Sequence, residues 1–138
     1  MPTKNWPREW NRDLPFLFPR KQEVLDIHAQ LIEAFGGIRG LRDEAALESA
    51  LASADNREFY ESADLATCAA TYSYHLTQAH AFIDGNKRVA AAVSEIFLEL
   101  NGARLTATDE QIVTVFCDIA ASKLSRDEVQ EFFTHWTI

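Results

Sequence analysis

Residues 65–100 read LATCAATYSYHLTQAHAFIDGNKRVAAAVSEIFLEL and contain two helical patterns separated by a polar turn. In the first half, apolar and small side chains recur every three or four positions, which predicts a helix that ends at or near His80. The same spacing returns at Val89 and continues to Leu100, which predicts a second helix. The alanines at positions 90–92 let neighbouring helices approach closely, so we expect this second helix to be central.

Helical spacing also covers most of the remaining chain. All four prolines fall within residues 1–19, so no proline ring interrupts a helix after them. Helices are predicted over residues 24–35, from a cap at Asp43 to about residue 51, over 112–119 after a capping box that begins at Thr108, and over 129–136 after one that begins at Ser125. Residues 55–62 show no helical period and predict an exposed loop or a short hairpin. The predicted fold class is all-α: a single-domain bundle of about six helices with one short loop or hairpin.

Residues 1–19 are predicted to form an irregular lead-in to one domain at residues 20–138. A chain of 138 residues is long enough for one domain with its own core and too short for two ordinary ones. The lead-in carries the aromatic residues Trp6, Trp10, Phe16 and Phe18. They predict either packing on the surface of the domain or contact with a partner, and packing is the simpler interpretation.

The charge balance argues against one class of partner. The chain has 21 Asp and Glu against 13 Lys and Arg, for a net charge of -8. A field of this sign repels a phosphate backbone, so we expect no direct binding of nucleic acid. A nucleotide site would need its own local positive charge, and the adjacent Lys87 and Arg88 supply it.

Cysteine usage and hydropathy indicate a cytoplasmic protein. Cys68 and Cys117 lie far apart, each within an apolar helical pattern, so we expect two reduced core thiols. The first residues lack the apolar segment of a signal peptide. Since no apolar run reaches membrane-spanning length, we expect no membrane partner.

The turn and the helix start after it predict a binding site for phosphate. The first turn of a helix exposes unpaired N–H groups and the positive end of the helix dipole. Gly85 lets the backbone approach an anion closely, and Asn86 suits the same turn and can add a side-chain amide. Lys87 and Arg88 add positive charge, and Arg can bind two phosphate oxygens at once.

His80 and Asp84 each admit two interpretations. A histidine at a helix end can simply contact terminal carbonyl groups, or it can accept the proton of an attacking hydroxyl. The position beside the phosphate site favours the second interpretation. Asp84 can cap the following helix, or it can hold a magnesium ion that bridges nucleotide phosphates. Phe82 is predicted to be a core side chain that fixes the turn, and His28 and His75 are predicted to be core or boundary residues.

Residues 80–88 also match the signature His-x-Phe-x-(Asp/Glu)-(Gly/Ala)-Asn-x-Arg, and by this motif the chain resembles the Fic/Doc (Fido) family. Lys87 stands where adenylylating Fic enzymes usually have glycine, so the similarity is to the Doc ("death on curing") branch, the toxins of toxin-antitoxin pairs. Residues 36–51 and 97–102 resemble the Doc-like segments before and after the motif.

The resemblance implies the Fic/Doc helical bundle, ATP and Mg²⁺ as cofactors, a cognate antitoxin and a host target protein as partners. It implies that residues 55–62 form the flap that aligns the target chain. The implied roles are general base for His80, magnesium ligand for Asp84, the lining of the anion hole for Gly85, Asn86 and Lys87, and contact with the nucleotide phosphates for Arg88.

Two further comparisons with the family bear on its chemistry. Fic enzymes carry a second arginine three residues after Arg88, and this chain has Ala91 there. Doc-like proteins share this departure, which implies transfer of the γ-phosphoryl group of ATP to a Ser, Thr or Tyr hydroxyl rather than transfer of AMP. Adenylylation by the same site and a non-catalytic Fic-fold binding module are the alternatives. The inhibitory motif of Fic proteins is approached only at Thr106-x-x-x-Glu110, which Gln111 follows, and we interpret this match as chance.

Overall fold

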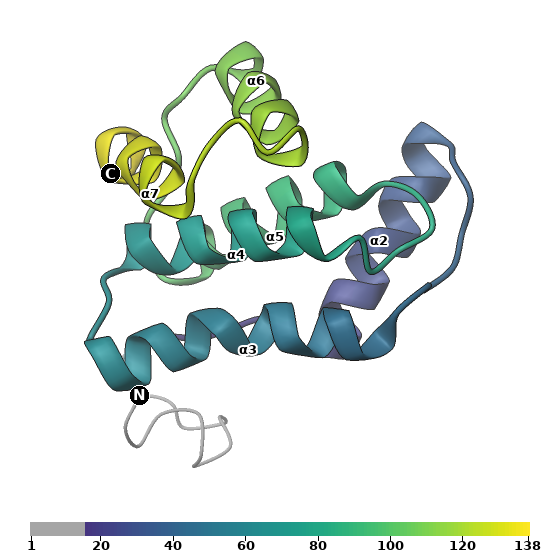
Figure 1. Cartoon of the computed structure of the whole chain (residues 1–138), viewed down its shortest axis with the longest axis horizontal. Helices are drawn as coiled ribbons and strands as arrows, with labels where there is room; N and C mark the ends of the chain where they lie inside the picture. The colour runs from purple at the N-terminus through teal and green to yellow at the C-terminus, as the bar shows by residue number, and fades with distance from the viewer. Residues whose placement is uncertain (1–15) are drawn as a thin grey trace.

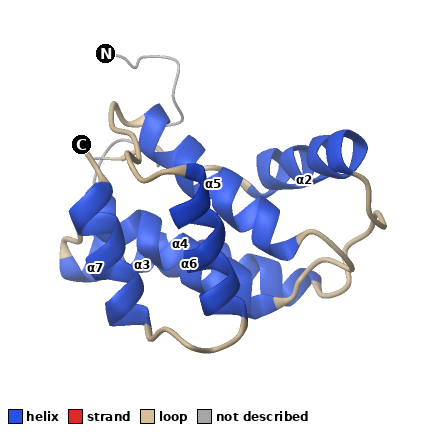
Figure 2. Cartoon of the chain, turned by 90° about the horizontal axis from the view of Figure 1, so that it is seen from above, coloured by secondary structure: helices blue, strands red, loops and turns tan. Residues whose placement is uncertain are grey.

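The computed structural model describes residues 16–138, and Figure 1 shows them as a bundle of helices joined by short loops. The six helices in this range are α2 (Lys21–Phe35), α3 (Glu44–Glu61), α4 (Leu65–Ala79), α5 (Asn86–Leu100), α6 (Asp109–Ala120) and α7 (Arg126–Trp136). Between residues 16 and 138 there is no strand, and Figure 2 shows only helix and loop there. The predicted all-α class is confirmed. No helix in the described range is both long enough and apolar enough to cross a membrane.

Helix α4 lies at the centre of the bundle, and it packs against α3, α5, α6 and α7. Nine of its fifteen residues are buried, most of them small, which lets neighbouring helices approach from several sides. The alanines of α5 had predicted that α5 would be central. That prediction was wrong, because α4 and not α5 is the helix around which most of the others pack. Helix α5 packs against α2, α4 and α6 and buries six residues along one face.

Short polar side chains begin three of the helices as the sequence predicted. Asp43 Oδ1 accepts a hydrogen bond from the amide of Ala46 at 3.0 Å and so caps α3. Thr108 and Ser125 form reciprocal capping boxes at the starts of α6 and α7. Asp64 caps α4 in the same way. Each of these caps fixes where its helix starts. The Asp64 cap fixes the start of α4, the helix that ends at His80.

The segment 55–62, predicted as a loop or hairpin, is the second half of α3 up to Glu61. Leu47, Leu51 and Ala54 carry the buried face of this helix, and Glu58 continues it at the next helical position. The prediction failed because the inward face changes from apolar to acidic after Ala54, so that a count of apolar side chains ends too early. The resemblance implied that residues 55–62 form a flap. A flap requires a loop or a hairpin, so the helical structure does not support that role.

The end of the lead-in packs on the bundle. The rings of Phe16 and Phe18 lie with their centroids 6.3 and 5.3 Å from that of Phe97 on α5. Asn101, just after α5, accepts a hydrogen bond from the amide of Leu17 and donates one to its carbonyl. Packing is therefore the correct interpretation for these two aromatics, whereas Trp6 and Trp10 lie outside the described residues.

Candidate functional site

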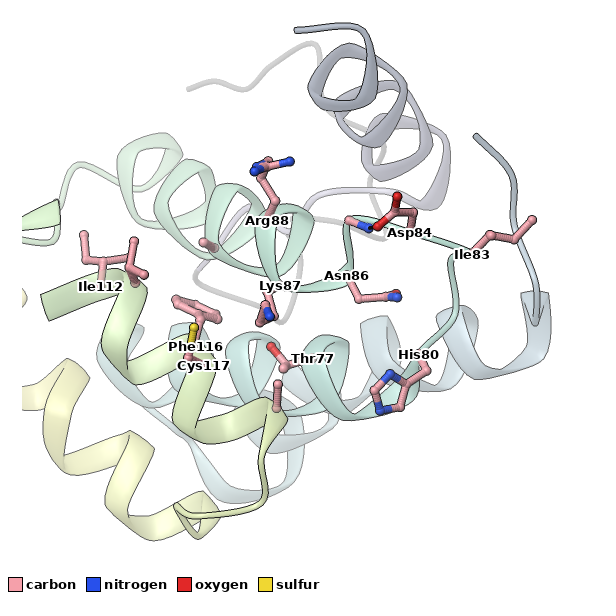
Figure 3. Close-up of a pocket in the computed structure, with 14 residues that line it drawn as sticks. Thr77, His80, Ile83, Asp84, Asn86, Lys87, Arg88, Ile112, Phe116 and Cys117 are labelled. Atoms are coloured by element: carbon pink, nitrogen blue, oxygen red, sulfur yellow. Dashed lines mark hydrogen bonds between the residues drawn. The ribbon is translucent and has the colours of Figure 1, made fainter. Parts of the chain in front are cut away.

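A cavity of about 520 Å³ lies where the end of α4, the turn that follows it and the first turn of α5 face one side of α6 (Figure 3). All the site residues predicted from the sequence line this cavity: His80, Asp84, Gly85, Asn86, Lys87 and Arg88. The structure thus brings the predicted base, the predicted metal ligand and the predicted phosphate site to one hollow. The residues between the two helices, 81–85, are called the motif turn below.

His80 is the residue at which α4 ends, and its backbone adopts the left-handed conformation with φ 49°. This conformation costs a residue with a side chain about 1–2 kcal/mol, so its neighbours must hold it. Arg42 does so, because Nη2 and Nε of its guanidinium donate to the carbonyl oxygen of His80 at 2.7 and 3.2 Å. Within residues 16–138 the exposed imidazole itself makes no hydrogen bond, so its ring nitrogens are available to other partners at the cavity that it lines.

Asp84 links the motif turn to the loop that follows α2. Its Oδ1 accepts from the amide of Gly85 at 2.9 Å, and its Oδ2 accepts from the amide of Ile38 at 3.1 Å. The interpretation of Asp84 as a helix cap finds no support, since α5 starts at Gly85 without a side-chain cap. Each carboxylate oxygen keeps a lone-pair direction for a further partner.

Asp84 also bears on the predicted magnesium ion. The described residues contain no group of three or more His, Cys, Asp or Glu side chains able to enclose a metal. Magnesium at nucleotide sites needs no such group, because one or two carboxylates hold it together with substrate phosphates and water. A single exposed carboxylate beside the predicted phosphate site fits that pattern.

Asn86 and Phe82 close the motif turn upon itself. The side-chain oxygen of Asn86 accepts from the amide of Phe82 at 3.0 Å, and its side-chain nitrogen donates to the carbonyl of Phe82 at 2.9 Å. Phe82 is 2% exposed, as expected for a side chain that fixes the turn. In this structure the Asn86 side chain thus shapes the turn at the predicted anion site, while Gly85, with φ 78°, supplies the backbone bend that only glycine adopts readily.

His28, on α2, is a part of the site that the sequence did not reveal. It is 5% exposed, which confirms it as a core residue, but its contacts are with the motif turn. Its ring stacks on that of Phe82 with centroids 3.9 Å apart, and Nε2 donates to the carbonyl oxygen of Asp84 at 2.8 Å. His75 is half-buried, and burial lowers its pKa, as expected for a boundary residue.

The loop at residues 36–43, called the glycine loop below, runs antiparallel to the motif turn. The amide of Ile83 donates to the carbonyl of Gly40 at 3.0 Å, and the amide of Arg42 donates to the carbonyl of Ala81 at 2.7 Å. A Cβ atom on Gly37 would lie 2.7 Å from Oδ2 of Asp84, and one on Gly40 would lie 2.9 Å from the Ile83 side chain. The segment that lies edge to edge with the motif is therefore this loop, and not residues 55–62.

Lys87 and Arg88 form the positive part of the site. Both are exposed on the first turn of α5, and neither forms an ion pair with any of residues 16–138. The guanidinium carbon of Arg88 lies 4.6 Å from the centroid of the Phe35 ring, a cation–π contact that leaves its N–H groups available. Two cations without carboxylate partners at a helix N-terminus attract an anion, even in a chain of net charge -8.

Helix α6 supplies the apolar side of the cavity. Its contribution consists of Ile112, Val113, Phe116, Cys117 and Ala120. Cys117, predicted as a core thiol, is exposed here, whereas Cys68 is buried as predicted. The prediction for Cys117 was wrong because an apolar stripe that lines a cavity has the same spacing as one that packs in a core. Glu110 of the chance inhibitory match does not line the cavity.

Two comparisons with known proteins identify the family of the chain. A family model described as the Fic/DOC family matches residues 18–98, which include the glycine loop, the motif turn and most of α5. The chain is also similar to the protein kinase doc of Escherichia phage P1. The two are 31% identical over 90 residues, which cover 64% of this chain and 71% of that relative. This chain belongs to the Fic/DOC family, in its Doc branch.

Proposed function

We propose that this protein transfers the γ-phosphoryl group of ATP to a Ser, Thr or Tyr hydroxyl of a host protein. One observation carries the proposal: His80, Asp84 and the cationic N-terminus of α5 line a single cavity. Phosphoryl transfer requires little covalent chemistry from a protein, and consists mainly of positioning and charge stabilisation. The residues that line the cavity support both roles, and the similar phage protein is named a protein kinase.

In the proposed reaction, each site residue has one role. His80 accepts the proton of the acceptor hydroxyl. The hydroxyl oxygen then bonds to the γ-phosphorus, the bond between that phosphorus and the β-phosphate oxygen breaks, and ADP leaves. The amides of the first turn of α5, together with Lys87 and Arg88, bind the phosphate oxygens. Asp84 would hold the magnesium ion, which when bound neutralises phosphate charge.

Transfer of the γ-phosphoryl group, rather than AMP, is supported by Ala91. This residue lines the cavity one helical turn beyond Arg88, with a methyl group and no charge. An arginine there would bind the distal phosphates and so present the α-phosphorus to the base. Without it, the proposed pose places the distal end of the triphosphate next to His80. AMP transfer by the same residues is the second candidate.

The glycine loop is proposed to receive the acceptor chain. It already pairs by backbone hydrogen bonds with the motif turn on one side, and Ile38 in the loop and Ile83 in the motif turn are exposed apolar side chains. An extended target segment that adds to this edge would bring its hydroxyl near His80.

We further propose that the protein acts in the cytoplasm as a toxin whose activity a separate antitoxin restrains. Glu110, the only residue of the described chain that resembled an internal inhibitory glutamate, faces away from the cavity. The absence of Glu110 from the cavity lining supports the proposal that a separate protein, a cognate antitoxin, provides this control.

Labelled ATP distinguishes the candidates. The purified chain is incubated with host lysate, magnesium and ATP labelled at either the γ- or the α-position. Label on a host protein from the γ-position alone supports phosphorylation, and label from the α-position supports AMP transfer. His80→Ala should abolish labelling, while His135→Ala, a change at an exposed histidine outside the cavity, should not. No transfer from either position would leave only a non-catalytic binding module.

A further inference from the structure

The cavity extends beyond the residues that the proposed reaction uses. Away from the motif turn it is lined by Thr77 of α4 and by Phe116, Cys117 and Ala120 of α6 (Figure 3). These four residues are called the thiol end of the cavity. They hold two chemically distinct groups, a hydroxyl and a thiol, to which the proposed phosphoryl transfer assigns no role.

The hydroxyl of Thr77 lacks a partner. Thr77 is 1% exposed, and its Oγ1 makes no hydrogen bond. Two other buried hydroxyls of α4 behave differently, because Thr71 and Ser73 each donate to the carbonyl four residues earlier, at 2.7 and 2.9 Å. A buried polar atom without a partner is rare and unfavourable. Figure 3 shows the Thr77 oxygen directed into the cavity, where a bound group would satisfy it.

The thiol of Cys117 is accessible from the same space. Cys117 is exposed and unpaired, and it lies on the cavity side of α6. The other cysteine offers an internal comparison: Cys68 is fully buried, and burial together with the nearby Glu58 and Asp64 raises its pKa to about 12. Because the thiolate is the reactive form, only Cys117 is expected to react with a reagent in solution.

The charge at the cavity selects the kind of reagent. Lys87 and Arg88 line the same cavity as Cys117, they outnumber its one carboxylate, Asp84, and they form no ion pair within the described chain. An anionic reagent is therefore concentrated there, and a cationic one is repelled. Small disulfides of the glutathione class carry net negative charge and several polar groups able to pair with Thr77 and Lys87.

We propose that Cys117 is a site of reversible S-thiolation by a small anionic disulfide, and that the adduct occupies the cavity and excludes ATP. The regulatory part of this inference rests on the proposed nucleotide site. The Cys117 thiolate attacks one sulfur of the disulfide, a new S–S bond forms to Cys117, and the old S–S bond breaks. The second half leaves as a thiolate, which takes up the proton that Cys117 released, and excess free thiol reverses the exchange.

The first measurement follows the reaction at each cysteine. The full chain is treated with oxidised glutathione or with cystamine, a cationic disulfide, and the adducts are located by peptide mass spectrometry. We expect glutathione on Cys117 and not on Cys68, at least about tenfold faster than cystamine, with the advantage shrinking at high salt. Cys117→Ser should form no adduct. Reaction at Cys68 instead, or equal rates for the two disulfides, would overturn the inference.

The second measurement follows nucleotide binding by titration calorimetry. The chain with the adduct should bind Mg-ATP at least about tenfold more weakly than the untreated chain, and dithiothreitol should restore binding. In Cys117→Ser, oxidised glutathione should leave the affinity as it was before treatment. An adduct on Cys117 that does not change the affinity would refute the regulatory role. An untreated chain that binds no ATP would instead refute the proposed function, and the reaction rates would then decide on the modification site alone.

Discussion

Among the single residues, the groups proposed to do the chemistry and the groups that hold them come from different parts of the chain. His80 to Arg88 form one run, so the sequence could reveal them as a set. Arg42 and His28 reach the motif from 38 and 56 residues away. Their contacts depend on tertiary packing, and no spacing in the sequence indicates them. The sequence therefore grouped the candidate reactive residues, whose roles stay a prediction, and missed the residues that position them.

Arg42 is predicted to support the rate of transfer rather than the affinity for ATP. Arg42→Ala removes both hydrogen bonds to the carbonyl of His80, whose left-handed backbone then has no side-chain support. Each such bond contributes about 1 kcal/mol, so we expect kcat to fall roughly tenfold or more, with little change in the KM for ATP. Steady-state kinetics with γ-labelled ATP measures both constants. A variant that raises only KM would show that Arg42 acts on nucleotide binding.

His28 is predicted to stabilise the motif turn through its hydrogen bond as well as its packing. His28→Phe keeps a ring to stack on Phe82 but leaves the carbonyl of Asp84 without its donor. We expect the free energy of unfolding to fall by about 1–3 kcal/mol. His28→Ala, which also removes the stacked ring, should cost more. Urea denaturation measures both variants, and a His28→Phe protein as stable as the wild type would contradict the account.

At the scale of the elements, the predictions succeeded where polar caps and apolar stripes agree. The capping residues Asp43, Thr108 and Ser125 start their helices as the sequence indicated. Helix α3 is the exception, since its inward face continues from Ala54 to the carboxylate of Glu58. Counting apolar residues does not detect a helix face that carries both apolar and acidic side chains.

The helical state of residues 55–61 can be tested at Asn56, an exposed residue inside α3. Asn56→Pro should lower the free energy of unfolding by about 3 kcal/mol, because proline removes an amide donor and clashes with the preceding turn. Asn56→Ala, the matched control, should be neutral or slightly stabilising. Thermal and urea unfolding measure both. If the proline variant were as stable as the alanine variant, residues 55–61 would be a loop, as the sequence had suggested.

At the scale of the whole molecule, a net charge of -8 coexists with a cationic cavity and with an acidic residue between helices. Asp55 on α3 faces Tyr72 on the central helix α4, whose hydroxyl donates to it at 3.5 Å. Burial raises the pKa of Asp55 to about 6 from 3.8, and the hydrogen bond from Tyr72 only partly opposes this effect. The stability of the bundle should therefore depend on pH.

Asp55 is predicted to make the protein less stable as the pH rises. Its folded pKa lies above the unfolded value, so its contribution to stability is fully present below pH 3.8 and is lost as the pH rises through about 6. Asp55→Asn, which cannot ionise, should have a higher Tm than the wild type at about pH 8, and the difference should vanish at about pH 4. Asp26→Asn, at an exposed position on α2, should show no such trend. Parallel Tm curves for wild type and Asp55→Asn would contradict the prediction.

We propose that the N-terminus of α5 binds the phosphates of ATP, and titration calorimetry with Mg-ATP measures that binding. Lys87→Glu reverses a charge inside the cavity, while Lys123→Glu makes the same change in net charge at an exposed position after α6, outside the cavity. We predict that the wild type and Lys123→Glu bind Mg-ATP with similar affinity and that Lys87→Glu binds at least about tenfold more weakly, a loss of about 1.4 kcal/mol. Absence of binding by the wild type, or equal affinities for all three proteins, would contradict the account.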